Sequence, residues 1–398
     1  IEITETGQEL ILDGVKIEFQ LTPESEAPAE MHFFFPEYEV LCMAENCSGT
    51  MHNVLTLRGA LVRDSLQWSR YIDEAIDRWG DSSQIVFASH GWPHWGQEAV
   101  KGYLTRQRDL YRWLHDQAMR LANLGYTPNE IAAEVDLPPG LWDDYMCHGY
   151  YGTVSHNVRA VYQRYIGFYD GHPSSLDPFT PVDAGKKYVD FMGGIDALLE
   201  KARAAFESGD YRWVAEVLRH AVFADPQNNQ VRLLQADAFE QLAYQAESGP
   251  WRDIYLTGAQ ELRNGSINIP VLQRPRLEVA KGMTLGQIFD FLAVKVDGPS
   301  AIKLGPVLIN WSFTDTGETA LLELSNGTLH SKIGSFSKSA DVIVSSSRDV
   351  IEELIATEYS LSQAIGDERV KISGDSEKIL NLWETFTDFP LFWPIIEP

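Results

Sequence analysis

The chain has 398 residues, and its 57 acidic against 32 basic residues give a formal net charge of −25. This acidity argues against nucleic acid or an anionic membrane surface as the main partner, because both are bound through clustered Lys and Arg. A hydrophobic content of 44% excludes general disorder, and three cysteines exclude a disulfide scaffold. No apolar run reaches the roughly 20 residues of a membrane-spanning helix, and the length predicts two or three domains.

The first 124 residues predict short strands followed by two helices. Apolar segments separated by Gly and Pro predict four strands, at Glu9–Leu12, Val15–Leu21, Met31–Phe35 and Val40–Ala44. Apolar residues at helical spacing predict a helix over 66–79, which ends at Gly80. The apolar run 85–88 ends in a Ser-His-Gly loop, as a buried strand does when it delivers a side chain to a site. A long helix is predicted over 97–124.

The middle and the end of the chain differ in character. Residues 187–248 predict helices throughout, and two of them flank a Gly-Asp turn in a way that resembles a tetratricopeptide-like hairpin; a plain helical bundle is the alternative. Residues 264–276 predict a linker. The remainder predicts a compact α+β unit. Its helices are expected over 283–294, 348–356 and 373–386, and its strands over 307–313, 319–324, 327–333 and 341–345.

Chemistry is expected in the first 172 residues, because eight of the ten histidines lie there. Three side chains in this part each follow a predicted strand, namely Glu26, Glu45 and His90, with separations of 19 and 45 residues. Carboxylate oxygen and imidazole nitrogen are ligands that zinc accepts. A solvated Glu and a hydrogen-bonded loop His are the alternatives.

Two further segments carry groups suited to an anionic substrate. Asn53 and Arg58 offer an amide and a guanidinium, and a guanidinium holds a tetrahedral oxyanion through paired hydrogen bonds. An arginine paired to one of the many acids is the alternative. Residues 148–165 include His156 and Tyr162 in a polar-aromatic run, which is typical of a pocket wall with proton donors or of a helix start whose aromatic residues face the core.

Three stretches, taken together and in order, resemble the alkyl sulfatases of the metallo-β-lactamase superfamily, and the resemblance runs the length of the chain. They are TPESEAPAEMHFFFPEYEVLCMAENCSGTMHNVLTLRGALVRD, ASHGWPHWG and GYYGTVSHNVRAVYQRYIGFYDGHPSSLDP. The resemblance implies that Glu26, Glu45 and His90 are metal ligands. Glu45 would bridge two Zn²⁺ ions in each active site.

The same resemblance implies roles for the other candidates. Asn53 and Arg58 fall in the stretch that binds the sulfate group. His156 and Tyr162 fall in the pocket wall, and His156 is the first candidate for protonating or steering the leaving group. The implied reaction is zinc-dependent hydrolysis of alkyl sulfate esters, such as dodecyl sulfate, to an alcohol and inorganic sulfate.

The implied fold class is α+β and multidomain. Residues 1–171 would form the C-terminal half of a metallo-β-lactamase αββα sandwich, and 172–270 a helical domain that makes a homodimer. Residues 277–398 would form a domain like sterol carrier protein 2. Neither a nucleic-acid partner nor a membrane span is expected.

One departure from the family is expected to matter. The family signature H-x-H-x-D-H is absent from this sequence, and three ligands do not close a two-zinc site. Because residue 1 is Ile rather than Met, we expect an N-terminal half of the catalytic domain, from the same gene or from a separate chain. The compartment, periplasmic or secreted versus cytoplasmic, stays open. A non-catalytic lipid- or alkyl-binding protein and another hydrolase of the superfamily are the alternative functions.

Overall fold

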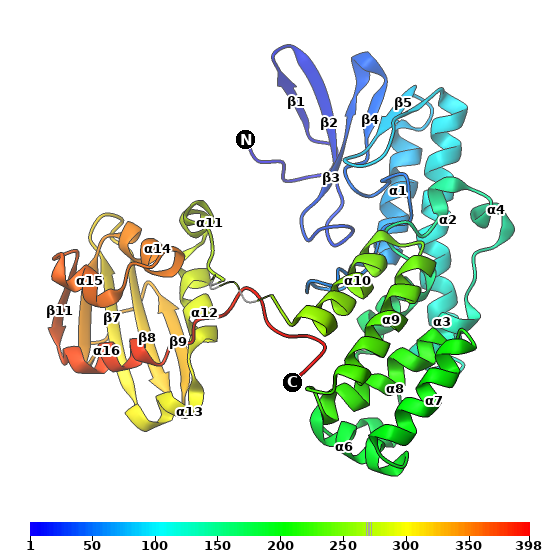
Figure 1. Ribbon diagram of the computed structural model, residues 1–398. Coiled ribbons are helices and arrows are strands. Elements are labelled where there is room, and N and C mark those ends of the chain that lie inside the picture. The colour runs from blue at the N-terminus through cyan, green and yellow to red at the C-terminus, as the bar shows by residue number, and fades with distance from the viewer. Residues whose placement is uncertain (268, 270, 272) are drawn as a thin grey trace. The chain divides into compact units, whose positions relative to one another are not determined.

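The computed structural model describes residues 1–267, 269, 271 and 273–398. The chain divides into two compact units, Ile1–Gly265 with Ile395–Pro398, and Ser266–Pro394 (Figure 1). The predicted linker 264–276 and the predicted domain end at 270 fall partly on residues outside the described ones. The α+β fold class is confirmed.

The first unit begins with a six-stranded sheet in the order β1-β2-β3-β4-β5-β6. The strands are β1 (Glu9–Leu12), β2 (Val15–Leu21), β3 (Met31–Phe35), β4 (Val40–Cys42), β5 (Ile85–Phe87) and β6 (His94–Trp95). All neighbours are antiparallel except the parallel pair β4 and β5. Asp13 and Gly14 join β1 to β2 with φ angles of 49° and 87°, as a two-residue hairpin turn requires. The four predicted strands are confirmed, although β4 ends at Cys42.

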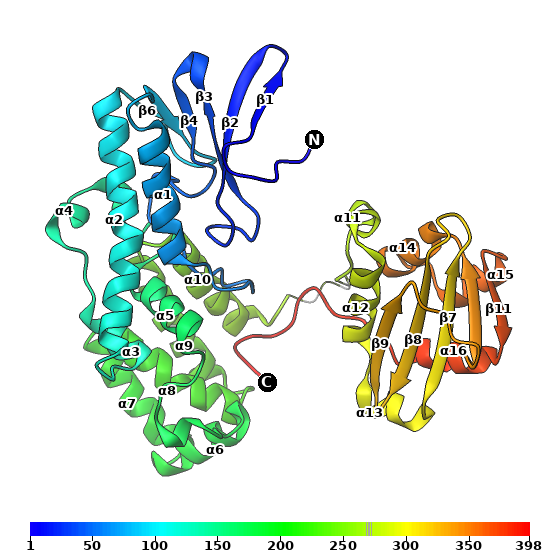
Figure 2. The same cartoon turned by 180° about the vertical axis from the view of Figure 1, so that it is seen from behind.

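Two long helices, α1 (Ser65–Trp79) and α2 (Gln97–Ala122), lie along one face of this sheet (Figure 2). Asp64 begins α1, because its carboxylate accepts hydrogen bonds of 3.0 Å from the backbone N–H groups of Leu66 and Gln67. Trp68 of α1 is fully buried and stacks on Tyr111 of α2 with ring centroids 4.3 Å apart. The apolar spacing that predicts these helices therefore marks the side that packs into the core.

The other face of the sheet, here called the open face, carries only apolar side chains, and no helix of this unit covers it in either view (Figures 1 and 2). Cross-strand pairing aligns Phe19 with Phe33, Phe33 with Cys42, and Cys42 with Phe87 on this face. Because side chains alternate along a strand, the open face is made of Val15, Ile17, Phe19, Leu21, Met31, Phe33, Phe35, Val40, Cys42, Ile85 and Phe87.

The rest of the first unit is helical. Its helices are α3 (Pro128–Glu134), α4 (Pro139–Trp142), α5 (Val154–Tyr165), α6 (Pro181–Phe191), α7 (Ile195–Glu207), α8 (Tyr211–Ala224), α9 (Asn229–Gln245) and α10 (Gly249–Asn264), with 3-10 turns at Pro36–Tyr38, Tyr145–Cys147 and Pro173–Ser175. Gly185 lets α6 approach α8, since a Cβ there would lie 2.6 Å from the carbonyl oxygen of His220. No described helix has the length and apolar character needed to cross a membrane.

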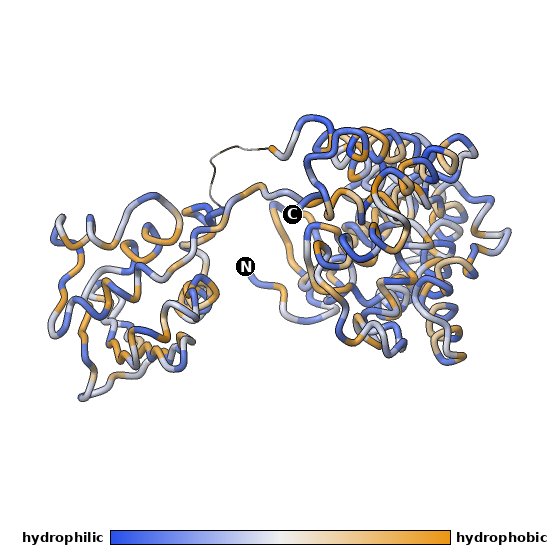
Figure 3. The backbone as a smooth tube through the Cα atoms, turned by 60° about the horizontal axis from the view of Figure 1, so that its bottom comes forward, coloured by the Kyte–Doolittle hydropathy of each residue, from blue (hydrophilic) through white to orange (hydrophobic). Residues whose placement is uncertain are grey.

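The second unit holds a five-stranded sheet in the order β11-β10-β7-β8-β9. The strands are β7 (Val307–Phe313), β8 (Thr319–Ser325), β9 (Thr328–Ile333), β10 (Val342–Ser346) and β11 (Val370–Gly374); the helices are α11 (Leu277–Gly282), α12 (Leu285–Lys295), α13 (Gly298–Ala301), α14 (Arg348–Ala356), α15 (Leu361–Gly366) and α16 (Ser376–Glu384), with a 3-10 turn at Ile302–Leu304. Hydrophobic and hydrophilic residues alternate along these elements (Figure 3). The prediction missed the short helices α11, α13 and α15. It also missed β11, whose sequence VKISG is short and partly polar, and therefore began the last helix three residues too early.

Candidate metal and anion site

The candidate site lies at one edge of the first sheet. Strands β2, β4 and β5 run in the same direction, because β3 is antiparallel to both β2 and β4, and β5 is parallel to β4. Their carboxyl ends therefore meet at one edge, where open α/β sheets place their ligands. Glu26 follows β2, Glu45 follows β4, and His90 follows β5.

At this edge the structure brings Glu26 and Glu45 together with a third residue, His52. One carboxylate oxygen of each Glu and one ring nitrogen of His52 lie within 4.8 Å of one another. Glu45 also reaches the third predicted ligand, since its Oε1 lies 3.3 Å from Nε2 of His90 while its Oε2 lies 3.4 Å from Nε2 of His52. Glu45 thus sits between two imidazoles. His90 is largely exposed, with 64% of its side chain accessible.

Glu30 ties together the two loops that carry Glu26 and Glu45. Its Oε1 accepts a 2.9 Å hydrogen bond from the backbone N–H of Glu45, and its Oε2 accepts bonds of 3.1 Å from the backbone N–H of Glu26 and the hydroxyl of Ser25. Burial, together with the nearby Glu26 carboxylate, raises the pKa of Glu30 to about 7. The separation of the two candidate ligands therefore depends on one partly buried side chain, that of Glu30.

The buried side chains of Asn46 and His32 also hold these loops in place through hydrogen bonds. Asn46 Oδ1 accepts from the backbone N–H of Glu26 at 3.3 Å, and Asn46 Nδ2 donates to Nε2 of His32 at 2.7 Å. This contact makes Nε2 of His32 the acceptor, so its Nδ1–H donates to Gln20 Oε1 at 3.0 Å. Burial lowers the pKa of His32 to about 3. The imidazole is therefore held neutral in a fixed tautomer.

Arg63 is the cation that contacts the cluster. Its guanidinium forms a close ion pair with Glu26 and donates to Asn53 Oδ1 at 2.6 Å and to the Asn53 carbonyl oxygen at 2.9 Å. It also lies 3.1 Å from Nδ1 of His52. Burial lowers the pKa of His52 to about 4, and the Arg63 charge acts in the same direction. His52 is therefore neutral at physiological pH.

Arg58 does not touch this cluster directly. It is exposed and lines a cavity of about 690 Å³ whose wall also includes Glu26, Arg63 and Arg164. Asn53 is buried, and its amide oxygen is already bonded to Arg63. The structure thus places Arg58 beside the cluster, in a cavity whose wall also carries the guanidinium groups of Arg63 and Arg164.

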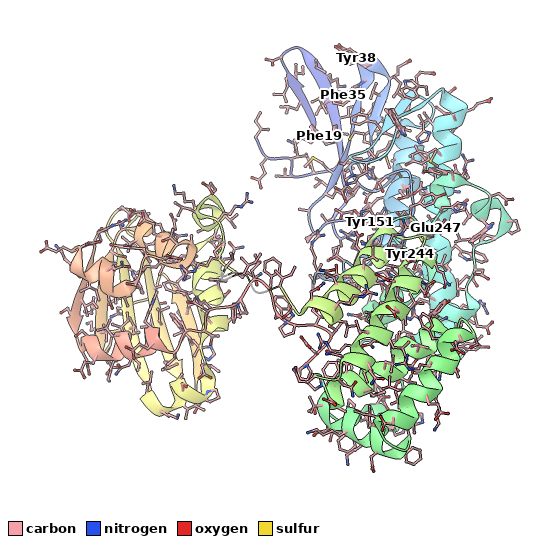
Figure 4. The ribbon with its side chains drawn as sticks, viewed as in Figure 1. Phe19, Phe35, Tyr38, Tyr151, Tyr244 and Glu247 are labelled. Atoms are coloured by element: carbon pink, nitrogen blue, oxygen red, sulfur yellow. The ribbon has the colours of Figure 1, made fainter. Side chains whose placement is uncertain are left out.

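A second cavity, of about 500 Å³, borders the cluster on the side of His52 and His90. Its wall is largely aromatic, with Trp92 and Tyr145, Tyr150 and Tyr151 among its residues. The ring of Tyr151, labelled in Figure 4, packs 4.8 Å from that of His52. The cluster therefore lies between a cationic cavity and an aromatic one.

His156 and Tyr162 lie away from this arrangement. Nε2 of His156 bonds to the carbonyl oxygen of Leu55 at 2.7 Å, and its ring packs edge-on to Trp251 of α10. The Tyr162 hydroxyl donates to the carbonyl oxygen of Tyr169 at 3.2 Å, and the side chain is buried. Among the described residues that line the two cavities, neither is present. Their predicted roles stay predictions.

Sequence reasoning did not single out His52 or Glu30 as site residues. His52 stands directly before Asn53 in a segment that does carry a signal, but one His beside an amide does not reveal which side chain faces the carboxylates. Glu30 lies four residues after Glu26 and next to an apolar strand. A charged residue at the border of a buried strand is the signal that indicates it.

Comparison with known proteins decides the family. Residues 127–265 match the family described as alkyl sulfatase dimerisation, and 275–398 match alkyl sulfatase C-terminal. A linear primary-alkylsulfatase from Pseudomonas sp. strain ATCC 19151 is 31% identical over 394 residues, which cover 95% of this chain and 73% of that protein. The chain belongs to the alkyl sulfatase family. The predicted family is thereby confirmed.

Two further relatives of this family match all of the chain. Another linear primary-alkylsulfatase from Pseudomonas sp. is 43% identical over 396 residues, 59% of its length. The solved structure of the stereoselective inverting sec-alkylsulfatase Pisa1 from Pseudomonas sp. is 43% identical with a TM-score of 0.94, and the match covers 62% of that chain. The chain thus spans about three fifths of the length of these alkyl sulfatases. The sterol-carrier-like character of 277–398 stays a prediction.

Proposed function

We propose that this chain supplies part of the active site of a zinc-dependent alkyl sulfatase, which hydrolyses alkyl sulfate esters to an alcohol and inorganic sulfate. The observation that carries the proposal is the cluster of Glu26, Glu45 and His52 at the carboxyl edge of the sheet, with ligand atoms within 4.8 Å. The names of the relatives, all alkylsulfatases, support the substrate class.

The donor set fits zinc in part. Glu26, Glu45, His90 and His52 offer the carboxylate oxygens and imidazole nitrogens that zinc accepts, and a carboxylate between two imidazoles suits a ligand shared by two ions. A bound zinc ion supplies a water that ionises near neutral pH. For Nε2 of His52 to hold a metal ion, the ring proton must be on Nδ1, which would donate a hydrogen bond to the Asn53 carbonyl oxygen 3.1 Å away. Four side chains do not close a two-zinc site.

The remaining ligands are proposed to come from an N-terminal half of the catalytic domain. The open face supports this, because it presents apolar side chains from every strand from β2 to β5 without a covering layer in this unit. Sheets with one apolar face are stable when a second layer packs about 10 Å above them. A second sheet there would complete the αββα sandwich that the family resemblance implies.

The two cavities suit the two ends of an alkyl sulfate. Arg58, Arg63 and Arg164 line the cationic cavity, where Arg63 and Arg164 are paired with Glu26 and Glu24 of the same wall. Arg58 has no ion pair among the described residues, so its guanidinium is the one best placed to hold a sulfate through paired hydrogen bonds. Asn53 holds Arg63 in place through two hydrogen bonds rather than facing that cavity. The aromatic cavity offers an apolar wall to an alkyl chain, each methylene of which gains about 0.8 kcal/mol on leaving water. The geometry gives His156 no contact with either cavity.

The proposal also includes a homodimer and a role for the C-terminal domain. The match of 127–265 to a dimerisation family supports a homodimer formed through the helical part of the first unit. Residues 277–398 are proposed to be a non-catalytic domain that gathers alkyl chains, as sterol-carrier-like domains bind lipids.

Zinc binding by the chain itself tests the proposal. Equilibrium dialysis against zinc is expected to show saturable binding that Glu45→Gln weakens at least about 100-fold, because a ligand shared by the cluster is lost. Glu37→Gln, the same change at an exposed position before β4, is the control and should bind zinc like the unchanged chain. Equal zinc binding by Glu45→Gln and Glu37→Gln would contradict the proposed site.

Arg58→Ala tests the anion side independently of the metal. Zinc binding should not change, because Arg58 does not contact the cluster. When the chain is combined with the proposed N-terminal half that carries the remaining metal ligands, Arg58→Ala should lower kcat/KM for dodecyl sulfate about 30- to 1,000-fold. The reason is that one charged hydrogen bond to the sulfate is lost. Normal kinetics would show that Arg63 and Arg164 bind the sulfate without it.

A further inference from the structure

A separate groove in the first unit gathers positive charge in a strongly acidic chain. It has a volume of about 360 Å³ and lies among α3, α5, α8, α9 and α10. Two guanidinium groups, of Arg159 and Arg212, line it, together with the side chains of Asn129, Trp251 and Tyr255. No Asp or Glu is among the described residues that line it, in a chain with a net charge of −25.

The Arg159 side chain is held in one orientation by its neighbours. Its Nε donates to Asn129 Oδ1 at 3.0 Å, and its Nη1 donates to the carbonyl oxygen of Ser155 at 2.8 Å and the hydroxyl of Ser155 at 2.6 Å. These acceptors are neutral, so the positive charge is not balanced. Within the described part of the chain, no side chain or backbone group accepts a hydrogen bond from Nη2. A guanidinium held in this way loses little entropy when it binds an anion.

Arg212 adds a second charge on the facing helix α8. It is exposed and forms no ion pair within the described residues. Burial of Arg159 and the charge of Arg212 both lower the pKa of Arg159, as expected for two like charges that share one groove. Two unbalanced cations at this place favour a ligand that carries two negative charges.

We infer that this groove binds a doubly charged tetrahedral oxyanion, sulfate or phosphate, between Arg159 and Arg212. A dianion neutralises both guanidinium groups at once, whereas a single carboxylate neutralises one. The Tyr255 hydroxyl, Gln245 amide and Trp251 indole in the same wall are neutral groups that tolerate an anion beside them. This inference does not depend on the proposed function, because the groove lies outside both cavities beside the metal cluster.

Calorimetric titration of the 398-residue chain with sodium sulfate, and separately with sodium phosphate, at constant ionic strength tests the inference. Saturable binding of one ion per chain at this groove is expected, measured in Arg58→Ala so that the sulfate site proposed beside the metal cluster does not contribute. Arg159→Gln and Arg212→Gln should each weaken it about 10- to 100-fold, because each removes a charged hydrogen bond. Arg219→Gln, which removes the same charge from another position on α8, is the matched control and should leave the affinity unchanged. Tighter binding of one of the two anions shows whether the natural ligand of the groove carries a sulfate or a phosphate group.

Two outcomes would overturn the inference. One is sulfate and phosphate binding that is absent, or that Arg219→Gln weakens as much as Arg159→Gln does. The other is a shift from dimer to monomer in Arg159→Gln and Arg212→Gln, by light scattering, without any anion binding by the unchanged chain. The groove would then hold a carboxylate of a second copy, since all of its lining residues fall within the segment that matches the dimerisation family. Arg58→Ala should leave this anion binding intact, which separates it from a failure of the proposed active site.

Discussion

The two sheets of the chain differ in how their apolar faces are covered. In the second unit, β8 alternates buried Ala320, Leu322 and Leu324 with partly exposed residues, and helices cover the apolar face. In the first unit, the face covered by α1 and α2 combines apolar Phe34, Leu41 and Val86 with polar Gln20 and His32, all at most 4% exposed, while the open face is apolar throughout. The second unit therefore buries the apolar face of its sheet by itself. The first unit packs its covered face against α1 and α2 and positions the site from it, whereas no helix of this unit lies over its open face.

Truncating one apolar side chain in each sheet should change the free energy of unfolding of the two units by clearly different amounts. Leu322→Ala should lower the free energy of unfolding of the second unit by about 2–5 kcal/mol, because Leu322 is 3% exposed in a closed core. Phe33→Ala on the open face should lower that of the first unit by less than about 1.5 kcal/mol, because the ring is only partly buried and packs against Phe19 and Phe35 of the same face rather than against a covering layer. Chemical denaturation of each variant, monitored by hydrogen exchange of amides in each unit, measures the change in the free energy of unfolding of both units.

The expected cost of Phe33→Ala becomes large when a second layer covers the open face. In the completed enzyme, Phe33→Ala should cost about 3–5 kcal/mol, as for other fully buried Phe residues. Equal costs for Phe33→Ala in the chain alone and in the completed enzyme would show that the open face receives no second layer. Phe35, on the same face and labelled in Figure 4, offers a second position for this test.

A smaller effect is expected at Glu30, on the loops that the covered face positions. Glu30→Gln keeps the shape of the side chain but presents an NH₂ group to one of two backbone N–H donors, those of Glu26 and Glu45. An unsatisfied buried donor costs about 1–3 kcal/mol. Amide hydrogen exchange at residue 26 or 45 should therefore accelerate about 10- to 100-fold.

The control for this prediction lies in the same hydrogen-exchange experiment. Amides in α1 and α2 should keep their rates, because the Glu30 carboxylate accepts its hydrogen bonds from Ser25, Glu26 and Glu45 rather than from these helices. A uniform acceleration across the first unit would indicate general destabilisation rather than release of the two loops.

The sequence predicts the elements of this site better than its contacts. Alternation along 15–21 and 31–35 and the helical spacing of 66–79 are local properties, and the structure confirms them. Placing Glu26, Glu45 and His90 at strand ends was also possible, since strand ends are visible in the sequence. The pairing of Glu45 with His52, and of Arg63 rather than Arg58 with Glu26, depends on how the loop after residue 45 folds back. No periodicity in the sequence encodes that path.

The smallest expected effect is the pH dependence that His32 gives to the first unit. Burial lowers the pKa of His32 to about 3, so the folded chain keeps this imidazole neutral where an unfolded chain takes up a proton below about pH 6.5. The contribution of His32 to stability is therefore present in full above pH 6.5 and is lost as the pH falls from 6.5 toward 3. At pH 5.5 the loss should be about 1 kcal/mol relative to pH 7. Urea denaturation at the two pH values measures it, and the C2 proton of His32 should keep its NMR chemical shift over this range. A shift that moves with a midpoint near pH 6.5 would show that the ring is hydrated, and that the chain from Gln20 through His32 to Asn46 does not hold the loop of Glu26 in solution.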